Sequence, residues 1–271
     1  MPVHIHTPEE IAKMRVAGKL ASAVLEMITP HVQPGITTEE LDKLCYDFIT
    51  DQQHAIPACV GYRGYQHTIC ASINEVVCHG IPSDRQLKEG DIVNLDVVVE
   101  KDGFHGDTSK MFVVGKGAVL AERLVRVTQE CMYLGIKTVK PGAYIEEIGM
   151  AIQQHAEKNH FSVVEDFCGH GVGAKMHEEP QILHYRNSWI ENNKIRKKPI
   201  TMPLSQMMEP GMIFTIEPMI NVGKPTIKVK PDGWTAITRD HSLSAEWEHT
   251  ILVTETGYEV LTLRSEEQGK L

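Results

Sequence analysis

The chain of 271 residues contains an internal repeat, and this repeat constrains its fold more than any other feature. Residues 32–41, VQPGITTEEL, match residues 139–148, VKPGAYIEEI. Residues 90–96, GDIVNLD, match residues 211–217, GMIFTIE, and the segment GDTSKMF at 106–112 matches WEHTILV at 247–253. The matches predict two homologous halves, at about residues 8–115 and about 116–263, related by a pseudo-two-fold axis.

Local patterns predict alternating helices and strands. Thr7 to Glu10 form a capping box with proline at the first helical position, and Thr37 with Glu40 repeats the box. Apolar side chains follow the first box at helical spacing: Ile11, Met14, Ala17, Ala21 and Leu25. The periodicity predicts further helices at 123–137 and 146–158 and buried strands at 212–217 and 248–253. Residues 91–99 and 106–114 are expected to form a hairpin around Lys101-Asp102-Gly103.

Acidic residues occur inside the apolar strand segments. Asp96 interrupts NLDVVV and Glu217 interrupts FTIEPMI, where an unpaired buried carboxylate would cost several kcal/mol. The repeat pairs Asp96 with Glu217 and Asp107 with Glu248. Either these side chains face solvent, or the pseudo-two-fold axis brings them together around divalent cations, which would neutralise their mutual repulsion.

Three histidines seven residues apart, at 170, 177 and 184, lie in the glycine-rich segment FCGHGVGAKMHEEPQILHY, residues 167–185. Gly169, Gly171 and Gly173 disfavour a helix, and the odd spacing prevents one strand from aligning the imidazoles. We expect a turn that joins two extended pieces, 163–169 and 180–185. His170 is the candidate fifth metal ligand, although unrelated core or surface histidines would fit this segment equally well.

Composition excludes several classes of function. A formal charge of −9 and a pI near 5.9 argue against binding to DNA or to a membrane surface. The six cysteines form no CxxC pair, which indicates reduced thiols and a cytoplasmic protein, and no run of apolar residues is long enough for a transmembrane segment. Residues 187–206 resemble a surface insertion, and its basic cluster of Lys194, Arg196, Lys197 and Lys198 suggests either a solvated loop or a transient contact with the ribosome.

FCGHGVGAKMHEEPQILHY, NLDVVVEKDGFHGDTSKMF, FTIEP and WEHTILVT together resemble the signature of the type I methionine aminopeptidases. The resemblance extends from the first helix to about Leu263. It implies an α+β pita-bread fold, in which two pseudo-symmetric halves surround a central curved antiparallel sheet within a single catalytic domain at 1–271. It also implies removal of the N-terminal methionine from nascent polypeptides, with a preference for a small second residue.

The same resemblance implies two divalent cations per chain, of Co, Mn, Fe or a similar metal. Asp96 would chelate one, His170 and Glu217 the other, and Asp107 and Glu248 would bridge them. A hydroxide between the cations would attack the first peptide bond, and Glu217 would transfer the proton. His79 is expected near the substrate amine, and His177 near the scissile carbonyl, where it can stabilise the oxyanion.

The methionine side chain is expected to enter an apolar pocket, because a thioether packs well against aromatic rings. The resemblance implies that this pocket is lined by Cys59, Tyr62, Tyr65, Cys70 and Trp234. Met176 replaces an aromatic residue that many relatives carry beside His177, and we expect it to loosen the rim. His184 is expected at a strand edge or behind the ligands, without a chemical role.

Two other functions fit the same core. Prolidases and Xaa-Pro aminopeptidases share the expected ligands but usually carry an additional N-terminal domain. Some pita-bread proteins have lost the metals and act as binding modules, which the five intact ligands argue against. We expect the protein to be a monomer.

Overall fold

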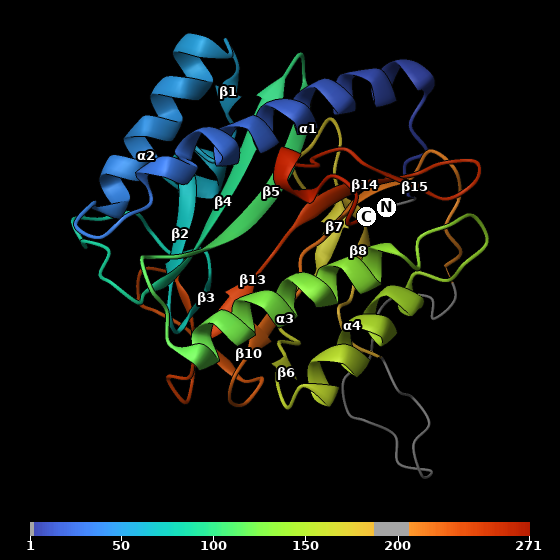
Figure 1. Ribbon diagram of the computed structural model, residues 1–271. Coiled ribbons are helices and arrows are strands. Elements are labelled where there is room, and N and C mark those ends of the chain that lie inside the picture. Colours follow the sequence, from blue (N-terminus) through green and yellow to red (C-terminus); the bar gives the residue numbers. More distant parts are fainter. Residues whose placement is uncertain (1–2, 187–205) are drawn as a thin grey trace.

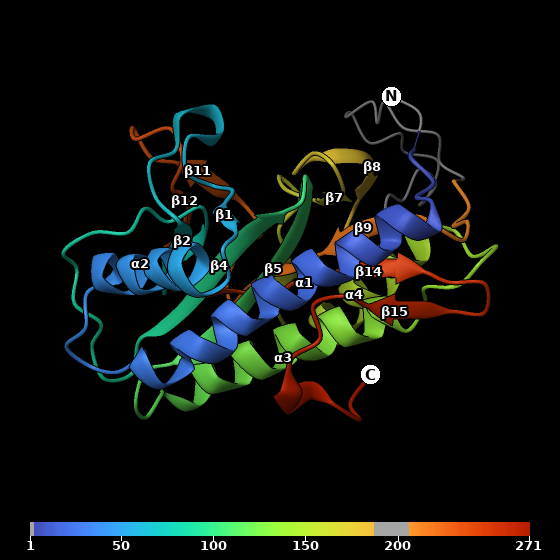
Figure 2. The same cartoon turned by 90° about the horizontal axis from the view of Figure 1, so that it is seen from above.

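Figures 1 and 2 show that the helices lie along one side of the strands in the computed structural model, which describes residues 3–186 and 206–271. The α-helices are α1 (Pro8–Ile28), α2 (Thr38–Asp47), α3 (Val119–Ile136) and α4 (Glu146–Lys158). Short 3₁₀ helices occupy Thr29–His31, Tyr62–Gly64 and Ser265–Glu267, and Phe48–Gln52 is a short π-helix. No helix within the described residues is long and apolar enough to cross a membrane.

Both predicted capping boxes are present. The Thr7 hydroxyl accepts a hydrogen bond from the amide of Glu10, whose carboxylate accepts one from the amide of Thr7. Thr37 and Glu40 do the same for α2. Helix α4 has its predicted bounds, whereas α3 begins at Val119 instead of Arg123, because its first turn exposes apolar side chains and so lacks an amphipathic pattern.

The first long hairpin is formed by β4 (Ile92–Lys101) and β5 (Phe104–Val113), which meet at the predicted Asp102-Gly103 turn. Both turn residues have positive φ, which Gly103 adopts without strain. Strands β1 (Ile56–Pro57) and β2 (Ile69–Ile73) pair with β4 on its other edge. Helix α1 packs across β4 and β5.

The second pair of long segments is interrupted at its middle. Strand β9 (Ile213–Ile216) pairs with β14 (His249–Val253), and β10 (Met219–Asn221) pairs with β13 (Ser244–Glu246). The register is the same on both sides of the break, so Glu217 lies opposite Glu248. Pro218 lacks an amide hydrogen, which explains why the ladder of hydrogen bonds stops there.

The remaining strands complete three sheets. Sheet β15-β14-β9-β7-β8 carries the histidine segment, and sheet β13-β10-β6 packs against α3 and α4. Sheet β11-β12-β3 lies near the end of the β4–β5 hairpin that is away from the Asp102-Gly103 turn. Their bounds are β3 (Val76–Cys78), β6 (Ser162–Val163), β7 (Gly169–Gly171), β8 (Glu178–Ile182), β11 (Ile227–Val229), β12 (Ala236–Thr238) and β15 (Tyr258–Val260).

Two apolar cores support these strands. One lies between α1, α2 and the inner strands β2 and β4, and includes Leu25, Leu41 and Leu95. The other lies between α3, α4 and β9, β13 and β14, and includes Leu124, Ile152 and Phe214. The order of two helices followed by two long strands thus occurs twice along the chain. Residues 187–205, with the basic cluster of the expected insertion, lie outside the described residues.

Candidate metal centre

All the predicted site residues line one cavity of about 260 Å³. Successive side chains of a strand point to opposite faces, so the register decides which residues reach this cavity. Asp96 and Val98 share one face of β4 with Asp107, which lies opposite Val98 on β5. Glu217, Met219, Glu246 and Glu248 share one face of the interrupted pair. Both faces line the cavity, which therefore collects carboxylates from both strand pairs.

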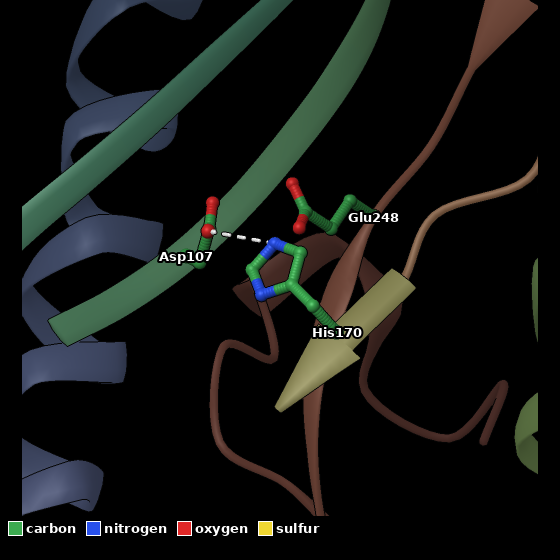
Figure 3. Close-up of side chains that lie close together, drawn as sticks. All are labelled: Asp107, His170 and Glu248. Carbon is green, nitrogen blue, oxygen red and sulfur yellow. Dashed lines mark ion pairs between the residues drawn. The ribbon is translucent and has the colours of Figure 1, made fainter. Parts of the chain in front are cut away.

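Asp107, His170 and Glu248 form the tightest group. One potential ligand atom from each lies within 4.8 Å of the other two, and Figure 3 shows the side chains of the three residues gathered around one point. Nε2 of His170 lies 3.8 Å from Oδ2 of Asp107 and 3.5 Å from Oε1 of Glu217. One imidazole among several carboxylates is a donor set that suits divalent transition metals.

Burial changes the protonation of every group in this cluster. It raises the pKa of Asp96 to about 7 and that of Glu217 to about 8. The pKa values of Asp107 and Glu248 are also well above their usual range, through burial first and then through the neighbouring carboxylates. Burial lowers the pKa of His170 to about 4, so its imidazole is neutral.

A divalent cation fits this arrangement. Oδ1 of Asp96 is buried without a hydrogen-bond partner among the described residues. Buried oxygen atoms of this kind are normally satisfied, and a bound cation would satisfy this one. A neutral imidazole is also the form of histidine that binds metals.

The backbone around His170 aims its imidazole at the carboxylates. Nδ1 lies 3.0 Å from the carbonyl oxygen of Gly171, a contact that places the ring proton on Nδ1 and leaves Nε2 free as a ligand atom. The amide of His170 donates to Oγ1 of Thr215, whose hydroxyl donates to Oε1 of Glu217 at 2.6 Å. A Cβ atom on Gly169 or Gly171 would lie 2.4 or 2.2 Å from a neighbouring carbonyl oxygen, which explains the flanking glycines.

His177 and His79 lie beside this cluster. The rings of His170 and His177 are 4.2 Å apart, and Nδ1 of His177 is hydrogen-bonded to the Tyr62 hydroxyl at 2.8 Å. Burial lowers the pKa of His177 to about 3 and also lowers that of His79. Both imidazoles are therefore neutral near pH 7 and available to donate or accept one hydrogen bond.

The other end of the cavity is apolar. Cys59, Tyr65, Cys70, Val98 and Met176 form a buried cluster, against which Tyr62 and Trp234 pack. Met176 is only 6% exposed and belongs to the wall of this cavity, where its flexible thioether fills space. Its expected effect on the rim stays a prediction.

The histidine segment differs from its expected form. The two extended pieces are β7 and β8. Most of the first expected piece, 163–169, is therefore loop, and the second piece begins at Glu178 instead of Pro180. This shorter hairpin brings His170 and His177 together, as expected for residues at a cleft. His184 is buried behind them, and its Nε2 accepts a hydrogen bond from the amide of Glu217.

Sequence reasoning missed several lining residues, of which Glu246 is the most important. A signal was present in SAEWEHT, because Glu246 precedes Glu248 by two positions and such residues share a strand face. The other missed residues give no comparable signal: Val98, Asp166, Phe167, Cys168 and Met219.

The model of the metallopeptidase family M24 matches residues 12–255. The chain belongs to this family. It is 57% identical to the methionine aminopeptidase of Escherichia coli K12 over 268 residues, which cover 98% of this chain and 96% of the relative. It is 51% identical to the methionine aminopeptidase of Haemophilus influenzae, with 98% and 95% covered. The expected resemblance is thus confirmed.

Solved structures confirm the α+β pita-bread fold of this M24 protein. The crystal structure of methionine aminopeptidase from Rickettsia prowazekii superposes with a TM-score of 0.89 at 49% identity, covering 97% of this chain and all of that one. The prolidase from Pyrococcus furiosus gives a TM-score of 0.72 at 19% identity, covering 96% of this chain and 66% of the prolidase, and shows a shared fold alone.

Proposed function

We propose that this protein is a metal-dependent aminopeptidase that removes the N-terminal methionine from nascent proteins and prefers a small second residue. The observation that carries the proposal is the cluster of Asp107, His170 and Glu248 beside an apolar pocket. Relatives named methionine aminopeptidase, 51–57% identical over nearly the whole chain, support it.

We further propose that five residues hold two divalent cations, of Mn, Fe, Co or a similar metal. Asp96 would bind one cation, His170 and Glu217 the other, and Asp107 and Glu248 both. Bound cations would supply Lewis acidity and lower the pKa of a water molecule, so that a nucleophile forms near neutral pH. The unpartnered Oδ1 of Asp96 and the free Nε2 of His170 support this assignment.

The side chains around the centre would divide the remaining chemistry. Glu217, whose Oε1 accepts a hydrogen bond from the Thr215 hydroxyl, would transfer the proton. His177 would donate a hydrogen bond from Nε2 to the scissile carbonyl, with its other nitrogen fixed by Tyr62. His79 would lie near the free amine. The methionine side chain would occupy the space among Cys59, Tyr62, Tyr65, Cys70 and Trp234.

Release of methionine from Met-Gly and Met-Ala peptides tests the proposal. Protein stripped with a chelator should be inactive, and added Mn²⁺ or Co²⁺ should restore release. Peptides with an Xaa-Pro N-terminus, assayed in parallel, distinguish an Xaa-Pro aminopeptidase. Failure to cleave any of these peptides with added metal would leave the metal-free binding module as the better account.

The setting of this activity is also a proposal. We propose a cytoplasmic monomer, and the six free cysteines, five of them buried, support a reducing compartment. A transient ribosome contact through Lys194, Arg196, Lys197 and Lys198 would suit a nascent-chain substrate. Charge reversal at these four positions should then reduce co-sedimentation with ribosomes without changing peptide cleavage.

A further inference from the structure

Glu246 is a further carboxylate in the cavity, beyond the five proposed ligands. It is the last residue of β13, it is 4% exposed, and it lines the same space as Asp96 and Glu217. Its position two residues before Glu248 puts both side chains on one face of their strand. The fold therefore delivers a fifth acidic side chain to the candidate metal centre.

Two contacts fix the backbone of Glu246. It pairs with Met219 in the ladder between β13 and β10. Its carbonyl oxygen accepts a hydrogen bond from Nδ2 of Asn94 at 2.9 Å, and the same amide group donates to Oγ of Ser109 at 3.0 Å. Because Asn94 shares a face of β4 with Asp96, these bonds tie Glu246 to the strands that carry Asp96 and Asp107.

The carboxylate of Glu246 has no cationic partner within residues 3–186 and 206–271. No lysine, arginine or histidine there forms an ion pair with it, and no group there donates a hydrogen bond to it. The charged side chains that line the cavity with it are also acidic and include Asp96, Asp107 and Glu217. A buried carboxylate among carboxylates lacks any stabilising charge unless a cation is bound.

We propose that Glu246 belongs to the metal-binding site and that its negative charge strengthens the binding of divalent cations there. The inference rests on the metal centre of the proposed function. Four carboxylates neutralise two dications, and Glu246 adds one negative charge beyond this balance. In a partly dehydrated cavity this charge should strengthen cation binding by about tenfold or more.

Titration of the chelator-stripped protein with Mn²⁺, followed by calorimetry, tests the inference. The E246Q variant keeps the size of the side chain and removes its charge, so its dissociation constant for Mn²⁺ should rise about tenfold or more. The E246D variant keeps the charge and should bind more tightly than E246Q. Glu39→Gln, an equal change of charge on the exposed surface of α2, should leave the affinity unchanged.

Thermal unfolding of the metal-free variants separates a role in metal binding from a role in folding. Metal-free E246Q should unfold at a temperature at least as high as the metal-free wild type, because glutamine fills the same space and brings no ionisable group into the buried cavity. An unchanged Mn²⁺ affinity in E246Q would overturn the inference, as would equal weakening by E246Q and E246D. A wild-type protein that binds no Mn²⁺ would instead contradict the proposed function itself.

Discussion

The backbone amide of Glu217 donates a hydrogen bond to Nε2 of His184 at a distance of 3.1 Å. This bond lies at the break between β9 and β10, and it satisfies the backbone donor of Glu217. Burial lowers the pKa of His184 to about 3, which keeps its imidazole neutral and able to accept. His184 therefore positions the peptide that carries Glu217.

Replacing His184 should show this role. His184→Leu leaves the Glu217 amide unsatisfied, and we expect kcat and the affinity for Mn²⁺ each to fall about tenfold, the effect of one lost buried hydrogen bond. His184→Gln retains a polar acceptor and should recover part of the loss. Steady-state kinetics and Mn²⁺ titration of both variants measure this. Equal loss in both variants would indicate a packing role alone.

The stability of metal-free protein should fall as the pH rises from about 6.5 to about 8. Burial raises the pKa of Asp96 to about 7 and that of Glu217 to about 8, far above their values in an unfolded chain. In this range the folded state binds more protons than the unfolded state, so the free energy of unfolding decreases with pH, by about 1 to 3 kcal/mol. Buried histidines with lowered pKa values, such as His170 and His184, are protonated only in the unfolded state and oppose this trend near pH 6.5, but their effect fades by about pH 7.5. Asp107 and Glu248, whose pKa values are also raised by burial, add to the trend.

Urea unfolding at several pH values, with chelator present, measures this trend. Excess Mn²⁺ should reverse its direction, because cations compete with protons for the same carboxylates and bind better as the pH rises. Constant or rising stability of the metal-free protein between these pH values would contradict the raised pKa values.

Tyr62 should matter for turnover more than for binding. Tyr62→Phe removes the hydrogen bond to Nδ1 of His177 but keeps the ring that packs against the pocket. We expect kcat to fall about two- to tenfold with little change in KM. Tyr65→Phe is a matched control, because the Tyr65 hydroxyl donates to the carbonyl of Ile69 instead. A larger loss of kcat in the Tyr65 variant would contradict the role given to Tyr62.

A buried ion pair holds the C-terminal segment next to the strands that carry Asp107 and Glu248. Arg264 and Glu267 are fully buried, with Nε and Oε2 2.9 Å apart, and Arg264 donates to Oγ1 of Thr108, whose hydroxyl donates to the carbonyl of Glu248. Arg264→Met leaves the buried carboxylate of Glu267 without its guanidinium partner, with contacts to the Tyr133 hydroxyl and to His249 remaining, and should destabilise the protein by about 3 kcal/mol in urea unfolding. The double variant Arg264→Met/Glu267→Gln should recover part of this loss of stability. A double variant as unstable as Arg264→Met alone would contradict a stabilising role of the ion pair.

Local signals allowed much of the fold to be predicted. Two capping boxes fixed the starts of α1 and α2, and Asp102-Gly103 located the first hairpin. The cavity residues are predicted from the repeat of acidic positions and from the resemblance to a family. Local sequence patterns alone do not show which strand faces meet in the fold. Glu246 was missed because its strand, β13, contains only three residues and the family resemblance gives this position no role.

Long-range contacts account for most of what the sequence did not reveal. The bond between His184 and Glu217 joins residues on either side of 187–205, and Arg264 meets Thr108 across most of the chain. Such contacts depend on how two strand pairs face each other, which no local periodicity encodes. Likewise, His79 adopts a positive φ, which histidine seldom takes, and no turn motif in the sequence predicts this backbone conformation.

Anomalous diffraction from crystals grown with Mn²⁺ would test the proposed metal centre most directly. We predict two peaks in the cavity, bound by oxygen atoms of Asp96, Asp107, Glu217 and Glu248 and by Nε2 of His170. Protein that shows no Mn²⁺ in this cavity, while it releases methionine from Met-Ala peptides in the same buffer, would contradict the account.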